Sequence, residues 1–359
     1  MRSAVYDRLE QLLQAEIRKR YIYSVLLGVQ SQDGRIDFRG AAGAATVDSP
    51  YLIASITKMV TAATLMQLVD ERQIDLDAPV TDYLAPDLLD GIHVYKGVDY
   101  SHQLKVYQLV HQTSGLPDYY EDKPKNGVSL SSEIKRGRDR ALDLADMLAI
   151  TRSLSPKFAP DANGGRKSHY SDMNYQLLGE IIETVTGKPI GENFQTRVFD
   201  PLGLEQTYLY DCRTPRDGPP PLPVYYRDQA LNIPLFASSD KAAGGVVSTL
   251  SDSLRFLRAY FDGALFDRKH FARMMARWNT IIPPVIKYGY GLMRFQVPRA
   301  MNLFRYSPEL IGHSGSIGSF AFYVPKEGLY LVGTFNQADK PSRPFQFMLR
   351  TINAILKAG

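Results

Sequence analysis

The chain of 359 residues is 44% hydrophobic and 22% charged, a balance typical of an ordered globular protein. At roughly 150 residues per domain, the length predicts two or three domains, and the single cysteine, Cys212, excludes a scaffold held by intrachain disulfides. The formal net charge of +4 comes from scattered basic residues, so we expect no nucleic-acid partner. We expect Cys212 to be a small buried hydrophobic side chain.

The first 20 residues predict an amphipathic helix, with Leu9, Leu12, Leu13 and Ile17 on one side and charges on the other. This helix lacks the unbroken apolar stretch of a signal peptide, and no other run reaches the ~18 apolar residues of a membrane span. We therefore expect a cytoplasmic protein with no membrane span. A chain processed from a secreted precursor would show the same pattern.

The next region predicts a β-hairpin followed by a central helix. Residues 23–29 and 36–40 are apolar-rich runs joined by a turn that contains Asp33-Gly34, a pair that suits a tight reversal. From residue 55 to residue 72 the apolar side chains recur nearly all round the helical period, which is typical of a helix buried between layers.

Beyond this helix the pattern changes to helical pieces and long loops rich in proline and glycine, and strand-like runs return after residue 280. The predicted helices are 141–150, 174–186 and 344–356, and the predicted later strands are 288–294, 318–324 and 329–335. The sheet is therefore expected to be assembled from both ends of the chain.

The fold class predicted from these elements is α/β (α+β), an antiparallel sheet flanked by helices with an inserted all-helical domain. Residues 1–75 and 240–359 form the predicted sheet domain, which is discontinuous in sequence. Residues 76–239 form the predicted helical domain, and the active site is expected in the cleft between the two domains.

Ser55 and Lys58 are candidates for a nucleophile and its proton acceptor. Three residues apart at the start of a helix, their side chains project from one face. Unpaired N–H groups at a helix start suit the oxyanion that forms when a serine attacks an acyl carbon, and a poorly solvated lysine can accept a proton near neutral pH. Alone the pattern is weak, because a helix cap followed by a surface lysine has the same spacing.

Two further segments follow in order, Tyr170-Ser171-Asp172 before a predicted helix and His313-Ser314-Gly315 at the predicted opening of a strand. With Ser55 and Lys58 they resemble the motifs S-x-x-K, Y-x-N and K-T-G or H-x-G of the penicillin-recognising serine hydrolases. The resemblance is to the branch with class C β-lactamases, D-alanyl-D-alanine carboxypeptidases, D-aminopeptidases and β-lactamase-fold esterases. Residues 111–118 (HQTSGLPD) and 243–249 (AGGVVST) are also similar to segments of that branch.

The resemblance implies that Ser55 is the acylated nucleophile, Lys58 its proton partner, and Tyr170 the residue that activates Ser55 and later a water. It implies an oxyanion hole made by the backbone N–H groups of Ser55 and Ser316. Further residues would line the substrate site: Asp172, His313, Ser314, Gly315 and, at the mouth of the cleft, Tyr119. Read singly, Tyr170 could instead be a core aromatic residue and His313 a strand-edge histidine.

Two positions depart from the usual motifs. His313 stands in place of a lysine, and a neutral imidazole attracts a substrate carboxylate less than an ammonium does, so efficient β-lactamase action is not expected. Asp172 stands in place of an asparagine, and its carboxylate can only accept hydrogen bonds. If Asp172 faces Lys58 it favours the ammonium form of Lys58, and otherwise it serves to cap the helix that follows.

The function predicted is a serine hydrolase that acts through an acyl-enzyme on small esters or D-amino-acid-containing amides or peptides, with at most weak β-lactamase activity. The alternative is a penicillin-acylated binding or sensor protein with little turnover. We expect no cofactor, and no metal because His93, His102 and His270 have no metal-ligand spacing. The sequence gives neither the physiological substrate nor the oligomeric state.

Overall fold

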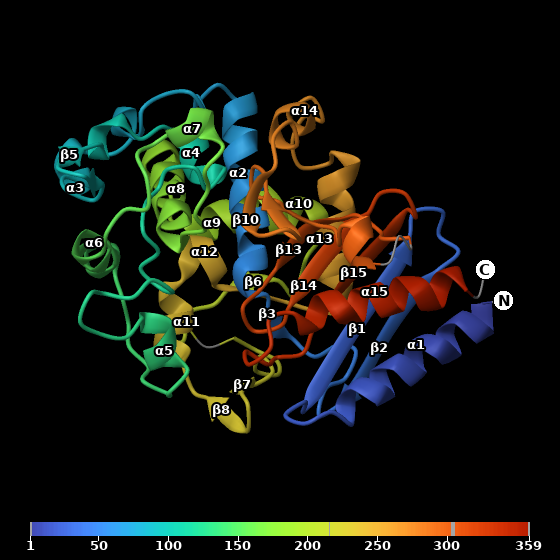
Figure 1. Cartoon of the computed structure of the whole chain (residues 1–359). Coiled ribbons are helices and arrows are strands. Elements are labelled where there is room, and N and C mark those ends of the chain that lie inside the picture. The colour runs from blue at the N-terminus through green and yellow to red at the C-terminus, as the bar shows by residue number, and fades with distance from the viewer. Residues whose placement is uncertain (1, 215, 303–305, 358–359) are drawn as a thin grey trace.

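The computed structural model describes residues 2–214, 216–302 and 306–357 (Figure 1). Its main sheet has eight strands in the order β10-β11-β12-β13-β14-β15-β1-β2, and every neighbouring pair is antiparallel. The strands are β1 (Ser24–Ser31), β2 (Asp37–Gly43), β10 (Asn279–Ile282), β11 (Ile286–Tyr288), β12 (Met293–Phe295), β13 (Leu310–Ser314), β14 (Phe320–Val324) and β15 (Leu329–Thr334).

The centre of this sheet joins strands from opposite ends of the chain. In the antiparallel pair of β1 and β15, Leu26 lies opposite Thr334 and Ser31 lies opposite Leu329. All six residues of β15 are buried, as expected for a strand covered on both faces. The predicted fold class, with an antiparallel sheet assembled from both ends of the chain, is confirmed.

Helices cover both faces of the sheet. The terminal helices α1 (Arg2–Ile17) and α15 (Arg343–Leu356) lie side by side on one face, where Figure 1 also shows the two chain ends close together. Leu9 and Leu13 of α1 are fully buried, so the predicted amphipathic helix is confirmed. Helix α13 (Leu250–Asp262) packs against β1, β14 and β15.

The two terminal helices are joined by a buried carboxylate. Glu16 of α1 is 0% exposed, and its Oε1 accepts hydrogen bonds from Lys19 at 2.7 Å and from Arg350 of α15. Glu16→Gln is expected to lower the free energy of unfolding by about 1 to 3 kcal/mol, because charge-assisted hydrogen bonds become neutral ones. Urea unfolding measures this loss. The matched control, Glu10→Gln on the exposed side of α1, should unfold at the wild-type midpoint, and equal midpoints for both variants would contradict the assignment.

The central helix α2 (Thr57–Asp70) is preceded by a 3-10 turn, η1 (Ala54–Ile56). Most of α2 is buried, as predicted, because it packs against α8 (Asp172–Thr186) and α12 (Lys241–Gly244), with η1 beside β13. Figure 1 shows α2 between the sheet and the helices of the middle of the chain. The first turn of α2 therefore lies where the two parts of the molecule meet.

The other elements are short. The helices are α3 (Pro86–Leu89), α4 (Val106–Val110), α5 (Leu130–Ile134), α6 (Leu144–Ser153), α7 (Ala162–Gly165), α9 (Ile190–Phe194), α10 (Asp200–Leu202), α11 (Pro234–Ser239) and α14 (His270–Met274), with single turns η2 (Val80–Asp82), η3 (Ser101–Gln103), η4 (Gln195–Phe199) and η5 (Arg299–Asn302). The small sheets are made by β3 (Tyr51–Leu52), β6 (Tyr208–Leu209) and β9 (Val246–Ser248), by β4 (Val94–Tyr95) and β5 (Val98–Asp99), and by β7 (Val224–Tyr226) and β8 (Gln229–Leu231). The proposed domain boundaries at residues 75 and 240 stay a prediction.

Three expectations are corrected by the structure. The predicted strand 288–294 is broken in the middle: Tyr288 ends β11, residues 293–294 belong to β12, and residues 289–292 form the turn between them, because Gly289 and Gly291 interrupt the run. The segment that contains His313 closes strand β13 and does not open it. Cys212 is exposed, because it lies in the loop after β6 and not in an apolar layer. Within the described ranges, no helix has both the length and the apolar character to span a membrane.

Candidate active site

Ser55 lies in a tightly held turn at the start of α2. The residue before it, Ala54, has φ +48°, a left-handed conformation that costs a non-glycine residue roughly 1 to 2 kcal/mol. Two hydrogen bonds fix the turn: the Ile53 N–H donates to the Val246 carbonyl at 2.9 Å, and the Ser319 hydroxyl donates to the Ile53 carbonyl at 2.7 Å. The main sheet and β9 thus both determine where the Ser55 hydroxyl points.

Lys58, one turn further along, is fully buried and its Nζ has three oxygen neighbours. They are the Ser55 Oγ at 3.1 Å, the Ala243 carbonyl oxygen at 2.7 Å and the Asp172 Oδ1 at 2.6 Å. An ammonium has three N–H donors, so this geometry accommodates a charged lysine paired with the Asp172 carboxylate. Asp172 therefore faces Lys58, and the N-cap position of α8 belongs to Ser171.

Residues 242–246, which follow α11, are hydrogen-bonded to the face of α2 that carries Lys58. The Val246 N–H donates to the Thr57 hydroxyl at 3.1 Å, and the Thr61 hydroxyl donates to the Ala242 carbonyl at 2.7 Å. Together with the bond from Lys58 to Ala243, these contacts keep the carbonyl of Ala243 aimed at Nζ.

Tyr170 completes the group. Its hydroxyl is buried and has no hydrogen-bond partner among the residues that the structure describes, and the Lys58 Nζ lies 5.1 Å from the centre of its ring. Burial, and then the charge of Asp172, raise the pKa of Tyr170 well above its usual value near 10, while the nearby Ser55 hydroxyl acts in the opposite direction. Tyr170 is thus a phenol that keeps its proton at neutral pH.

Residues 111–118 position the segment that carries Tyr170. The Gln112 side-chain oxygen accepts from the Ser171 N–H at 2.9 Å and from the Asn174 amide at 2.5 Å. The Ser114 hydroxyl donates to the Asn174 side-chain oxygen at 2.7 Å, and the Asp118 Oδ1 accepts from the Asp172 N–H at 3.2 Å. This segment therefore acts on the site through α8 and not by direct contact with Ser55.

Strand β13 ends beside Ser55. A Cβ at Gly315 would lie 2.8 Å from the Cβ of Ala54 and 2.9 Å from the Ile53 carbonyl oxygen, so a larger residue would push the strand away from Ser55. Ser316 follows in an exposed turn, and its N–H has no acceptor in the described part of the chain. His313 is fully buried with its ring centre 6.2 Å from that of Tyr170.

Two more carboxyl groups interact electrostatically with Asp172 and Lys58. Asp118 is buried, and burial, followed by the charge of Asp172, raises its pKa well above the usual value. Asp240 is half-buried, and the same two causes raise its pKa to about 7. The buried Tyr119 hydroxyl donates to the Asp240 Oδ1 at 3.2 Å. The surroundings of Lys58 are therefore acidic.

The model of the beta-lactamase family matches residues 9–353. The chain belongs to the beta-lactamase family. The resemblance inferred from the three motifs is therefore confirmed over almost the whole chain.

Relatives within the beta-lactamase family differ in their activities. A D-stereospecific amidohydrolase from Streptomyces sp. is 28% identical, with a TM-score of 0.76 and 97% of each chain covered. Esterase EstB from Burkholderia gladioli is 28% identical over 65% of this chain and 60% of its own length. A putative D-alanyl-D-alanine carboxypeptidase from Salmonella agona is 33% identical over 45% of this chain and 34% of its own length. The match spans less than two thirds of both curated relatives.

In this member of the beta-lactamase family, sequence reasoning missed several residues around the motifs. Asp118, Asp240 and the Ala243 carbonyl contact or influence Lys58, yet neither a single carboxylate nor the carbonyl of a four-residue helix gives a periodic signal in the sequence. Tyr288 was also missed, because one tyrosine among 22 does not stand out. Of the predicted residues, Ser314 is half-exposed at the end of β13, and its hydroxyl is 3.5 Å from the Met293 sulfur.

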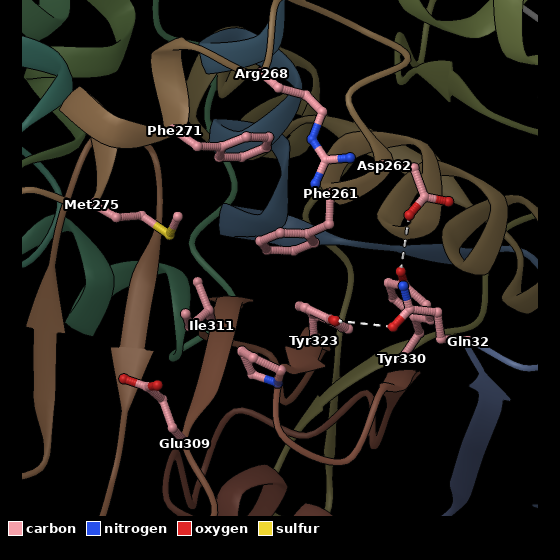
Figure 2. A pocket seen from close by; sticks show the side chains of 11 residues that line it. Gln32, Phe261, Asp262, Arg268, Phe271, Met275, Glu309, Ile311, Tyr323 and Tyr330 are labelled. Carbon is pink, nitrogen blue, oxygen red and sulfur yellow. Dashed lines mark hydrogen bonds between the residues drawn. The ribbon is translucent and has the colours of Figure 1, made fainter.

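A cavity of about 450 Å³ lies away from these residues, between the end of α13, the residues around α14 and the strands β13, β14 and β15 (Figure 2). Figure 2 shows its wall of aromatic side chains, with Tyr330 bonded to Asp262 and Tyr323 bonded to Gln32. No candidate site residue lines it; its lining residues are Gln32, Phe261, Asp262, Arg268, Phe271, Met275, Glu309, Ile311, Tyr323, Pro325 and Tyr330.

Proposed function

We propose that the protein is a serine hydrolase that transfers an acyl group from small esters or D-amino-acid amides to Ser55 and then to water. The geometry at Lys58 carries this proposal. The Ala243 carbonyl and the Asp172 carboxylate can only accept hydrogen bonds, so they fix two N–H groups of Lys58. The third position of Nζ faces the Ser55 Oγ, and in the neutral amine that position is the lone pair.

In acylation, Lys58 reacts in its neutral amine form: its lone pair takes the Ser55 proton while Oγ bonds to the acyl carbon, and the Asp172 carboxylate stabilises the ammonium that forms. The oxyanion is stabilised by the N–H groups of Ser55 and Ser316. When the tetrahedral intermediate collapses, the bond to the leaving group breaks and the leaving group needs a proton. The Tyr170 phenol, which keeps its proton and whose hydroxyl has no hydrogen-bond acceptor among the residues that the structure describes, donates it. In deacylation, water takes the place of the leaving group and the same transfers run in reverse.

The acidic surroundings of Lys58 favour substrates without a free carboxylate near the scissile bond. The Asp172 carboxylate repels a substrate carboxylate and attracts a free ammonium, whereas Asp118 and Asp240, whose pKa values are raised, add negative charge only as they ionise at higher pH. β-Lactams and peptides with a free C-terminus carry such a carboxylate, whereas simple esters and amino-acid amides do not. The similarity to a D-stereospecific amidohydrolase and to an esterase also supports amides and esters as the substrates.

A substrate panel tests the proposal. The protein is incubated with p-nitrophenyl acetate, with the D- and L-forms of an amino-acid p-nitroanilide, and with a chromogenic cephalosporin. We expect turnover of the ester and of the D-amide, and little turnover of the cephalosporin. A stable covalent adduct with the cephalosporin and no turnover of any substrate would identify a sensor instead.

Asp172→Asn is expected to raise the rate of acylation by penicillins relative to that by p-nitrophenyl esters. The substitution removes a negative charge beside Lys58 and supplies an amide donor for the side-chain carbonyl of a penicillin. The ratio of the two acylation rates is measured by stopped flow, with Asp87→Asn on exposed α3 as the control. An unchanged ratio in a folded Asp172→Asn variant would contradict the role of Asp172 in substrate choice.

A further inference from the structure

A contact between Tyr288 and His313 lies beside the site and has no part in the proposed acyl transfer. Tyr288 ends β11, two strands away from β13, and its hydroxyl oxygen is 3.3 Å from the His313 Nε2. The two rings meet edge to face with their centres 5.7 Å apart, and both side chains are fully buried. Tyr288 also lies edge to face with Tyr170, at 5.7 Å between ring centres.

The other nitrogen of His313 identifies the tautomer. Nδ1 is 2.9 Å from the carbonyl oxygen of Ser314. A carbonyl oxygen accepts hydrogen bonds and has no proton to give, so Nδ1 carries a proton. In a neutral imidazole Nε2 then has a lone pair, and the Tyr288 hydroxyl has to be the donor.

The next hydroxyl in the chain is consistent with this arrangement. As placed in the structure, the Tyr288 hydroxyl donates to the Tyr175 oxygen at 3.0 Å and the Tyr175 hydroxyl donates to the Val110 carbonyl at 3.1 Å. A phenol hydroxyl rotates, and the Val110 carbonyl also accepts from the Gly291 N–H at 3.2 Å, so the protons can run the other way, from Tyr175 to Tyr288 and from Tyr288 to His313. With the Tyr288 proton on Tyr175, the lone pair of a neutral His313 Nε2 would face the lone pairs of the Tyr288 oxygen at 3.3 Å with no proton between them, and only an imidazolium could fill that gap. Burial and the charge of Lys58 oppose that state, because they lower the pKa of His313 to about 3.

The turn after Tyr288 keeps its ring in this place. Gly291 has φ +68°, and a Cβ there would lie 2.4 Å from the Cβ of Ala62 in α2, so the turn packs closely against the central helix. The Gly291 N–H donates to the Val110 carbonyl at 3.2 Å, the same oxygen that accepts from Tyr175. The position of Tyr288 is therefore fixed relative to α2 and Lys58.

We propose that Tyr288 is a positioning residue that holds His313 as the neutral Nδ1–H tautomer by donating to its Nε2. Both ring nitrogens are then occupied by the protein, so His313 offers substrate no cation and no free donor. The ring supports Tyr170 from the side and leaves the Tyr170 hydroxyl free for the leaving group. The inference rests on the proposed function only for its kinetic consequences.

Nuclear magnetic resonance of ¹⁵N-histidine-labelled protein tests the tautomer without any substrate. The His313 signals are assigned as those absent from a His313→Gln variant. We expect Nδ1 to have the chemical shift of a protonated nitrogen and Nε2 that of an unprotonated one, both unchanged from about pH 5 to about pH 8. A protonated Nε2, or titration of the ring in that range, would overturn the proposal.

The variant Tyr288→Phe removes the donor and keeps the ring. We expect its Nε2 signal to shift and broaden, and its kcat for p-nitrophenyl acetate to fall about threefold to tenfold because the His313 ring is no longer held beside Tyr170. Tyr260→Phe is the matched control, since Tyr260 is equally buried and its hydroxyl has no partner among the described residues. Identical spectra and rates in wild type and Tyr288→Phe would overturn the proposal.

These readouts separate the inference from the proposed function. If the protein turns over no substrate but shows the expected His313 signals, the proposed function fails and the role of Tyr288 stands. If esters are hydrolysed but the His313 Nε2 is protonated, the proposed function stands and the role of Tyr288 fails. Ser55→Ala should leave the His313 spectrum unchanged in either case.

Discussion

Ser55→Ala is expected to reduce hydrolysis of p-nitrophenyl acetate more than about 1,000-fold, because the acyl-enzyme can no longer form. The substitution removes one hydroxyl that accepts a hydrogen bond from Lys58 at 3.1 Å, so the fold should be unchanged. Steady-state rates measure the loss, and circular dichroism checks the fold. Mass spectrometry of protein quenched during turnover should find the acyl adduct on wild type and none on the variant.

Ser316→Ala is the matched control for this experiment. In the proposed mechanism Ser316 contributes only its backbone N–H, and its side chain is exposed. We expect this variant to retain most of the wild-type rate. If Ser55→Ala kept more than about 1% of the activity in protein free of contaminating esterase, Ser55 would not be the nucleophile.

The sequence predicted the motifs well because each is local. Ser55 and Lys58 are three residues apart across the junction of η1 and α2, and this spacing lets the Oγ and Nζ atoms approach to 3.1 Å. The hairpin of β1 and β2 could also be predicted, because two apolar-rich runs joined by an Asp-Gly turn are a short-range signal. The resemblance then supplied what spacing could not, namely that Tyr170 and β13 belong to the same site.

The parts that sequence reasoning missed depend on long-range packing. Tyr288 reaches His313 only because β11, β12 and β13 pair in one register, with Met293 opposite both Tyr288 and Gly312. The run 288–294 had the apolar content of a strand, but two glycines turn it against α2. A pattern read along one strand cannot show a contact made across two neighbours.

The acidic surroundings of Lys58 illustrate the same limit. Asp172 was recognised as a departure from the family motif, and its direction was left open between Lys58 and a helix cap. In the structure, the Asp172 Oδ1 lies 2.6 Å from the Lys58 Nζ, so the carboxylate faces Lys58. Asp118 and Asp240 come from two other segments, and nothing in their own neighbourhood in the sequence indicates that they face the same lysine.

Lys58→Met is expected to cost both activity and stability. Activity should fall more than about 1,000-fold, since the proton acceptor for Ser55 is lost. The side chain of Asp172 is only 9% exposed, so its carboxylate would be left buried without its cation, and the free energy of unfolding should drop by about 3 to 5 kcal/mol. Urea unfolding at neutral pH measures the second effect separately from the first.

The double variant Lys58→Met/Asp172→Asn distinguishes the ion pair from the catalytic role. Removing both charges leaves no unpaired buried ion, so the double variant should regain most of the stability lost in Lys58→Met, and the two single variants and the double variant form a cycle that gives the coupling energy. Activity should not return, because no side chain in the double variant presents a lone pair to the Ser55 Oγ. A double variant that hydrolyses esters at the rate of Asp172→Asn would remove Lys58 from the mechanism. A single variant as stable as wild type would show that Asp172 is solvated or protonated when Lys58 is absent, and that the pair contributes to proton transfer without stabilising the fold.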